Sequence, residues 1–164
     1  MNDFNIRIYT EDKELPELLE GNFFHSKELF LIEEQTPKDT PYMAIATRDG
    51  KVRGQLLVVV RRRGSLFPPY LYTHAHAHGE GCYADEKETE TIFPLLLKAI
   101  TLQLRHRLCF YIEFSDMKKK MFGYRYFRRL GYFPIAWQEI HHSLHSKAPE
   151  SRLSAKMTNI VERM

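Results

Sequence analysis

The chain has 164 residues, of which 43% are hydrophobic and 13% aromatic, and its formal net charge is +3. This composition suits one globular domain with a hydrophobic core and excludes a disordered or low-complexity chain. Two cysteines are too few for a disulfide-stapled scaffold, and no apolar run reaches the roughly 18 residues of a membrane-spanning helix. We therefore expect a cytoplasmic protein without a membrane span.

The first part of the chain predicts a strand, two short helices and a β-hairpin. Residues 5–10 alternate between apolar and polar side chains, as in a half-buried strand. Residues 15–19 and 29–32 carry apolar side chains at roughly helical spacing, and the pair Gly21 and Asn22 predicts a break between them. The apolar runs on either side of Asp49 and Gly50 predict a hairpin, because this dipeptide suits a two-residue turn.

The middle of the chain predicts one more strand and the clearest helix. Residues 70–78 would extend the sheet. The following run, "TIFPLLLKAITLQLRHR", has apolar side chains at steps of three and four, which indicates a helix. With Thr91 as N-cap, Pro94 falls in the first turn, where its missing N–H is harmless.

The last elements predict a strand, a helix and another strand. Residues 108–116 are rich in β-branched and aromatic side chains, with Asp116 placed to cap the next helix. Residues 117–130 predict that helix, which Gly131 stops with a left-handed cap. Residues 133–145 return to strand-like alternation.

This order of sheet, helix, strand, helix and strand resembles the GNAT N-acyltransferase superfamily. The segment "YFRRLGY" carries the resemblance through Tyr126, Phe127, Leu130, Gly131 and Tyr132, which match a "Y-x-x-x-G-F"-like helix end. The resemblance implies an α/β fold of the α+β kind, with a GNAT-like mixed, largely antiparallel sheet flanked by helices.

Three segments also resemble the first half of the Fem family of peptidoglycan-bridge aminoacyltransferases. They are "GNFFHSKELFLI", the hairpin, and "PPYLYTHAHAHGEG". The resemblance implies an acyl or aminoacyl transferase of which this half contributes substrate binding. It implies a cell-wall precursor and an aminoacyl-tRNA as partners.

The same resemblance divides the chain into a GNAT-like domain at residues 1–148 and the start of a linking helix at 149–164. That tail carries an amphipathic stripe without a stop signal, so we expect a second domain beyond it. In its absence the stripe should fray or pack against a second copy of the chain in a homodimer.

The loop before the long helix departs from the acetyl-CoA-binding pattern. Ordinary members of the superfamily resemble "Q/R-x-x-G-x-G/A" here, where backbone N–H groups hold a pyrophosphate. This chain has "HGEGCYADEKETET", in which Gly79 and Gly81 suit a turn and are the only cofactor-binding candidates. Five acidic residues would repel a pyrophosphate: Glu80, Asp85, Glu86, Glu88 and Glu90. We expect no cofactor on this half, with acetyl-CoA or aminoacyl-tRNA as acyl donor of the whole protein.

Three histidines stand at every second position, His74, His76 and His78. In a strand all three imidazoles would share one face. Neighbouring same-face positions lie about 6 to 7 Å apart, so two histidines can share a metal ion but three in a straight row cannot. We expect no metal site here and interpret the histidines as candidates for lining a substrate groove.

Four further residues are substrate-binding candidates. Tyr70 and Tyr72 belong to the same strand as the histidines and could stack on sugars or peptides, although ordinary strand packing also explains them. Tyr124 and Arg125 lie in the later helix, and arginine suits a phosphate or carboxylate.

No catalytic residue can be assigned from the sequence. Glu113 is a carboxylate in a strand that otherwise looks buried, which suits a general base, but a period-two strand also fits an outward-facing residue. Two other functions stay open beside the Fem-type transferase. One is a self-contained CoA-dependent N-acetyltransferase with an atypical loop, and the other is a non-catalytic module that binds a peptide or sugar.

Overall fold

The computed structural model describes residues 4–64, 66–67, 71–106, 109, 111–115, 117 and 124–133. The tail at 149–164, the cap at Asp116 and all but the first residue of the expected strand at 133–145 fall outside the described residues.

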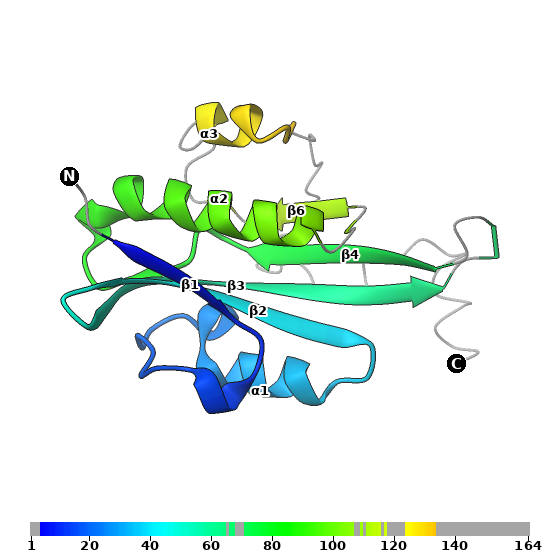
Figure 1. The fold of residues 1–164 in the computed structure, drawn as a ribbon, viewed down its shortest axis with the longest axis horizontal. Coiled ribbons are helices and arrows are strands. Elements are labelled where there is room, and N and C mark those ends of the chain that lie inside the picture. The colour runs from blue at the N-terminus through cyan, green and yellow to red at the C-terminus, as the bar shows by residue number, and fades with distance from the viewer. Residues whose placement is uncertain are drawn as a thin grey trace, which may run out of the picture. The chain divides into compact units, whose positions relative to one another are not determined.

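Six strands form one sheet in the order β1-β2-β3-β4-β6, with β5 paired to β3 (Figure 1). Their bounds are Asn5–Tyr9 (β1), Asp39–Arg48 (β2), Lys51–Gly64 (β3), Leu71–His78 (β4), Cys82–Tyr83 (β5) and Tyr111–Ser115 (β6). Only the β4–β6 pair is parallel within the described part of the chain. The expected mixed, largely antiparallel sheet is confirmed.

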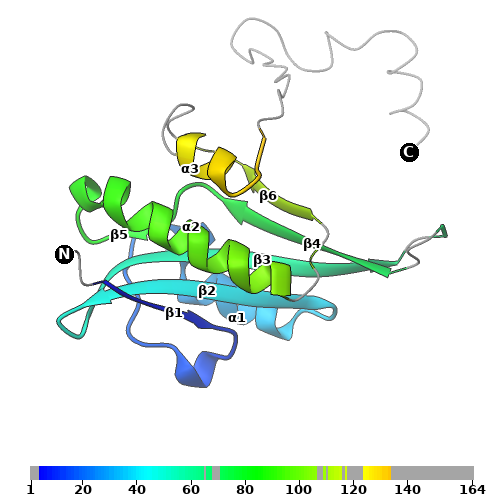
Figure 2. The same ribbon diagram turned by 45° about the horizontal axis from the view of Figure 1, so that its top comes forward.

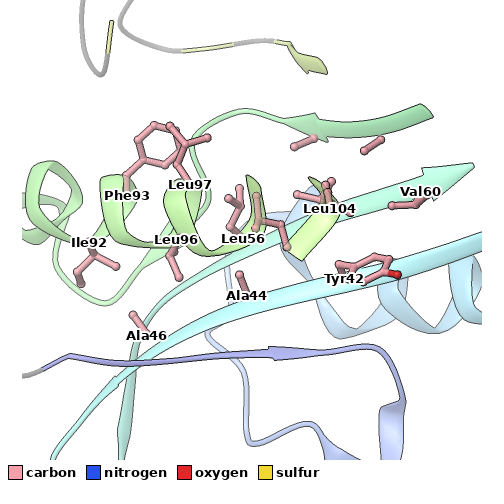
Figure 3. Close-up of a cluster of buried hydrophobic side chains, with 14 residues drawn as sticks. Tyr42, Ala44, Ala46, Leu56, Val60, Ile92, Phe93, Leu96, Leu97 and Leu104 are labelled. Carbon is pink, nitrogen blue, oxygen red and sulfur yellow. The ribbon is translucent and has the colours of Figure 1, made fainter. Parts of the chain in front are cut away.

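Helices cover both faces of this sheet (Figures 1 and 2). Helix α1 (Lys27–Gln35) lies on one side, where its buried Phe30 packs with Met43, Ile45 and Leu57. Helices α2 (Thr89–His106) and α3 (Tyr124–Arg129) lie on the other side. The larger core forms between α2 and the sheet (Figure 3), and its fully buried members include Ala44, Leu56, Ile92, Phe93, Leu96, Leu97, Ile100 and Leu104.

The β2–β3 hairpin forms as the sequence predicts. Asp49 and Gly50 both adopt positive φ, at 55° and 74°, which a two-residue turn of the primed type requires. Gly131 likewise adopts a φ of 86° after α3. Its N–H bonds to Arg128 O at 3.1 Å and the next N–H, of Tyr132, bonds to Phe127 O at 3.0 Å, so the expected left-handed cap is a Schellman motif.

The helix expected over residues 15–19 does not form. The chain is irregular there, between a 3₁₀ turn at Asp12–Glu14 (η1) and another at Phe23–His25 (η2). The side-chain amide of Gln55 accounts for this, because it accepts from Leu19 N at 2.8 Å and donates to Leu19 O at 3.0 Å. Backbone groups held this way cannot join a helix, and Leu15 and Leu18 still pack against the core on the α1 side.

The long helix begins earlier than its sequence predicts. A 3₁₀ turn at Glu86–Glu88 (η3) runs into α2, which starts at Thr89, so Thr91 is not the N-cap and Pro94 lies inside the helix. Asp85 caps the turn by accepting from Lys87 N at 2.9 Å. Glu88 is tied to Arg48 at 2.6 Å and Arg53 at 2.7 Å, which fixes this helix start against the hairpin.

Gly54 allows β5 and α2 to approach β3. A Cβ placed at Gly54 would lie 2.7 Å from a ring carbon of Tyr83 and 2.9 Å from a methyl carbon of Ile92. Both distances are shorter than carbon atoms tolerate. The sequence alone shows no reason for a glycine inside this strand, because the constraint comes from residues that are distant in the chain.

We predict that Gly54→Ala lowers the free energy of unfolding by about 1–3 kcal/mol, because the buried Ile92 and the partly buried Tyr83 ring must move to admit the methyl group. Urea unfolding followed by circular dichroism measures this loss. Gly64→Ala in the same strand is the matched control, since no atom of the described residues lies within 4 Å of the place that its Cβ would take. Equal stability of the two variants would contradict the prediction.

Candidate functional site

The three histidines of β4 lie on the face of the sheet that α1 flanks. Ala75 and Ala77 between them are buried in the core under α2, so the imidazoles point to the opposite face. The parallel register aligns His74 with Tyr111, His76 with Glu113 and His78 with Ser115. Strand β6 therefore contributes a carboxylate and a hydroxyl to the same face as the imidazoles.

His74 and Glu113 are hydrogen-bond partners. Its Nε2 lies 3.1 Å from Glu113 Oε2, and the two side chains are 20% and 22% exposed. A carboxylate only accepts hydrogen bonds, so Nε2 carries the proton and the lone pair of a neutral imidazole is on Nδ1. The ring of Tyr111, 4.9 Å away between centroids, packs against the imidazole. This orientation makes Nδ1 of His74 a proton acceptor.

Ser115 joins the other two histidines. Its Oγ lies 2.9 Å from His76 Nε2 and 3.1 Å from His78 Nδ1. A serine hydroxyl has one hydrogen, so at least one of the two imidazoles must donate to it. The hydroxyl thus helps to fix where an imidazole proton resides, and it holds the two rings, whose centroids are 4.1 Å apart.

A groove of about 220 Å³ runs along this histidine face. Phe23 and Phe24 from η2 form one wall and remain 56% and 46% exposed. The Phe24 ring lies 4.6 Å from the ring of His78. Arg61, Arg63 and Glu33 line the other end. The groove is smaller than a site for a drug-sized ligand and combines aromatic, imidazole and charged side chains.

The two phenylalanines reach the groove because a polar clamp holds η2 on the sheet. Gln55 is fully buried and, besides its bonds to Leu19, donates to His25 O at 2.7 Å. His25 is also fully buried, and its Nδ1 accepts from Leu57 N at 3.1 Å. Strand β3 pairs with β5 at Gln55 and with β4 from Val59 onward. The His25 imidazole therefore accepts a hydrogen bond from a β3 backbone N–H that lies between these two pairings.

His25 is held in its neutral form. Burial lowers its pKa from 6.5 to about 4, a nearby charge on His78 acts in the same direction, and the backbone of His78 partly opposes this. Its Nε2 makes no hydrogen bond of ordinary geometry with the described residues. Protonation would place an unsolvated charge between the sheet and η2.

The charged end of the groove is largely self-paired. Arg61 donates to Asp39 through Nε at 2.9 Å and through Nη2 at 2.6 Å, and it lies 3.8 Å from Glu33. These bonds hold the pKa of Asp39 below its usual range. Burial, together with the neighbouring Asp39 carboxyl, raises the pKa of Glu33. The backbone of Arg63 pairs with β4, and its exposed side chain forms no hydrogen bond or ion pair with the described residues.

The structure brings together only some of the residues predicted from the sequence. His74, His76 and His78 line one groove. Tyr72 lies in β4, in register with Arg63, and Tyr124 begins α3, but their side chains and all of Tyr70 fall outside what the structure describes. Arg125 is exposed on α3, on the side of the sheet opposite the histidines. The structure therefore does not unite it with the groove.

Other groove residues give no signal in the sequence. Phe24 and Arg63 line the groove, and Ser115 bonds to two of its histidines, through packing of segments far apart in the chain. Glu113 is evident from the sequence only as a carboxylate in a strand, without its partner. The alternation of the β6 strand is the one pattern that could have placed Glu113 and Ser115 on a common face.

The turn after β4 has the backbone that its glycines suggest. Gly79 and Gly81 have φ values of 74° and 105°, and Gly79 N donates to Ser115 O at 2.7 Å. A Cβ at Gly81 would lie 2.5 Å from the carbonyl oxygen of Gln55. Both glycines are thus explained by the turn itself, and their candidacy for cofactor binding stays a prediction.

The described residues contain neither a metal-binding cluster nor a membrane-spanning helix. Within the described ranges, no three histidine, cysteine, aspartate or glutamate side chains are placed to hold a metal ion. None of the helices in the same ranges is long and apolar enough to cross a membrane.

Solved acetyltransferases share this fold. An aminoglycoside acetyltransferase from an uncultured soil metagenomic sample, solved with trehalose and with sisomicin, is 12% identical with a TM-score of 0.51 over 89% of this chain and 97% of that one. A Trypanosoma brucei acetyltransferase is 10% identical with a TM-score of 0.52 over 86% of this chain and 100% of that one. No family model and no curated protein sequence matches the chain. The likeness shows the GNAT-like fold.

We predict that the free energy of unfolding falls as the pH is lowered from 6.5 to about 4. The unfolded chain binds a proton on His25 in this range, whereas the folded chain keeps the imidazole neutral. The lost stability amounts to about 3 kcal/mol at the acidic end. Urea unfolding across this pH range measures it.

His25→Asn removes the titrating group while keeping an acceptor for the Leu57 N–H, so its profile should be much flatter. His106→Asn changes an exposed histidine at the end of α2 and should keep the original slope. The raised pKa of Glu33 acts in the opposite direction but is common to all three proteins. An unchanged slope in His25→Asn would show that His25 is not the group responsible.

Proposed function

We propose that this protein is an N-acyltransferase that binds an amine acceptor in the histidine groove. The observation that carries the proposal is the His74–Glu113 pair at 3.1 Å, whose imidazole lines the groove, on a fold that solved acetyltransferases share. Transfer of an acyl group to an amine needs a base that removes the ammonium proton. An imidazole oriented by a carboxylate is a suitable base near neutral pH.

The proposed reaction uses His74 for proton transfer. The acceptor binds as an ammonium ion and gives one proton to Nδ1 of His74. The amine nitrogen then attacks the acyl carbonyl carbon, a C–N bond forms, and the bond from that carbon to the donor's sulfur or oxygen breaks. After the attack the nitrogen loses a second proton, which the leaving sulfur or oxygen takes up, and His74 releases the proton that it holds to solvent, so atoms and charge balance. Glu113 stabilises the imidazolium that forms on His74, because its carboxylate accepts the Nε2–H.

The identity of the acyl donor is a separate part of the proposal. The segments that resemble the Fem family favour an aminoacyl-tRNA donor and a cell-wall precursor as acceptor. The acidic residues before α2 argue against tight binding of acetyl-CoA, although Glu88 among them is neutralised by Arg48 and Arg53. Because Asp85 also caps the 3₁₀ turn, the chain's own groups occupy this helix start.

We predict that His74→Asn lowers kcat for acyl transfer by about 10²–10⁴-fold with little change in KM, because it removes the base and not the groove. Glu113→Gln should lower kcat less, by about tenfold or more, since it disturbs only the orientation of the imidazole. The assay offers acetyl-CoA and aminoacyl-tRNA in separate reactions with a panel of primary amines, and product is detected by mass spectrometry.

His106→Asn is the control for loss of an imidazole elsewhere in the chain and should keep full activity. Circular dichroism and the urea midpoint show whether each variant is folded. Transfer from neither donor by the unmodified chain, or full activity in His74→Asn, would refute the proposal. Transfer from one donor only identifies the acyl source.

A further inference from the structure

The groove holds a cation, Arg63, that no carboxylate of the described residues pairs with directly. Arg61 has its partner in Asp39, with three N–O contacts of 2.6 to 3.0 Å. Arg63 has the same orientation two residues later in β3 and lines the same groove. It influences Asp39 only through its charge, and as the last of the causes that lower the pKa of that carboxyl. Its planar guanidinium is therefore available to an anionic group of a ligand.

A negatively charged group lies near Arg63 on the same face of the sheet. His74 is directly opposite Arg61 in the β3–β4 register, and Tyr72 is opposite Arg63. Arg63 and His74 are therefore diagonal neighbours, which in an antiparallel pair stand about 7–8 Å apart, with their Cβ atoms somewhat closer. His74 Nε2 lies 3.1 Å from the carboxylate of Glu113. A small ligand with a positive group at His74, next to this carboxylate, and a negative group at Arg63 would complement both ends of the groove.

The two other carboxyl groups at this end of the groove, Asp39 and Glu33, do not neutralise Arg63. Asp39 is occupied by Arg61, and its side chain is only 2% exposed, so it presents little charge to a ligand. Glu33 shares the neighbourhood of Asp39 and Arg61 and is stabilised in its neutral form by burial. Arg63 is the more exposed group, and its long side chain can reach into the groove or along its rim.

We propose that the groove selects a small zwitterionic acceptor, in which a primary amine faces His74, whose other nitrogen is bonded to Glu113, and a carboxylate or phosphate is bound by Arg63. The inference rests on the proposed function for the amine end, and Arg63 adds the chemical class of the acceptor. Arg63 is a specificity-determining residue in this assignment and takes no part in proton transfer.

Two matched probe pairs test the proposal by isothermal titration calorimetry on the whole chain. O-phosphoethanolamine is compared with ethanolamine, and β-alanine with propylamine, so each pair differs mainly in the anionic group. The anionic member should bind at least about tenfold more tightly, which corresponds to about 1.4 kcal/mol. The preference should weaken as salt is raised, because the arginine is exposed.

Arg63→Gln should bring the members of each pair to nearly equal affinity. Arg62→Gln is the matched control, because Arg62 is also exposed but its side chain points to the other face of β3. That variant should keep the full preference. Both changes are at exposed positions, so both proteins should fold.

The outcomes separate the anion site from the catalytic proposal. A preference in one pair or in both, lost in Arg63→Gln and kept in Arg62→Gln, supports the inference and tells phosphate from carboxylate. Equal affinities within both pairs, no measurable binding of any probe, or equal loss in the two variants would overturn it. Selective binding without transfer would refute only the proposed function, and transfer to neutral amines without selective binding would refute only the anion site.

Discussion

The polar clamp on strand β3 is the constraint on which the rest of the groove depends. Between its pairings with β5 and β4, the backbone of β3 bonds to the imidazole of His25, and the buried amide of Gln55 binds the backbone of the incoming segment. Buried polar groups need partners, so these side chains hold an irregular segment against the sheet. That segment in turn places Phe23 and Phe24 beside the histidine row and leads directly into α1.

In strands β4 and β6, alternate side chains point to opposite faces of the sheet, so core residues and polar residues of the groove side are on different faces. In β4 the alanines face α2 and the histidines face the groove, and in β6 Ile112 and Phe114 face the aromatic core while Glu113 and Ser115 face the histidines. Small alanines let the long helix lie close to the sheet. The other face of β4 and β6 then carries a hydrogen-bond network, because the core residues of these two strands lie on the α2 side.

Several features were predictable from the sequence because their causes are local. The hairpin at Asp49 and Gly50 and the cap at Gly131 depend on glycine-compatible backbone angles within a few residues. The failures have causes outside the local pattern. Residues 15–19 have helical spacing, yet a side chain from β3 binds their backbone, and the α2 start is fixed by Asp85 and by two arginines of the hairpin. The spacing of apolar residues indicates which side chains are buried, but it does not indicate which distant side chains hydrogen-bond to the backbone.

The sequence by itself determined that the imidazoles of His74, His76 and His78 share a face, because alternation is a property of any extended chain. Only the tertiary structure decided what that face does. Parallel pairing with β6 brings Glu113 and Ser115 to the imidazoles, antiparallel pairing with β3 adds Arg63, and α3 carries Arg125 to the other side of the sheet. These neighbours are set by strand order and register, which depend on how the whole sheet is buried between its helices.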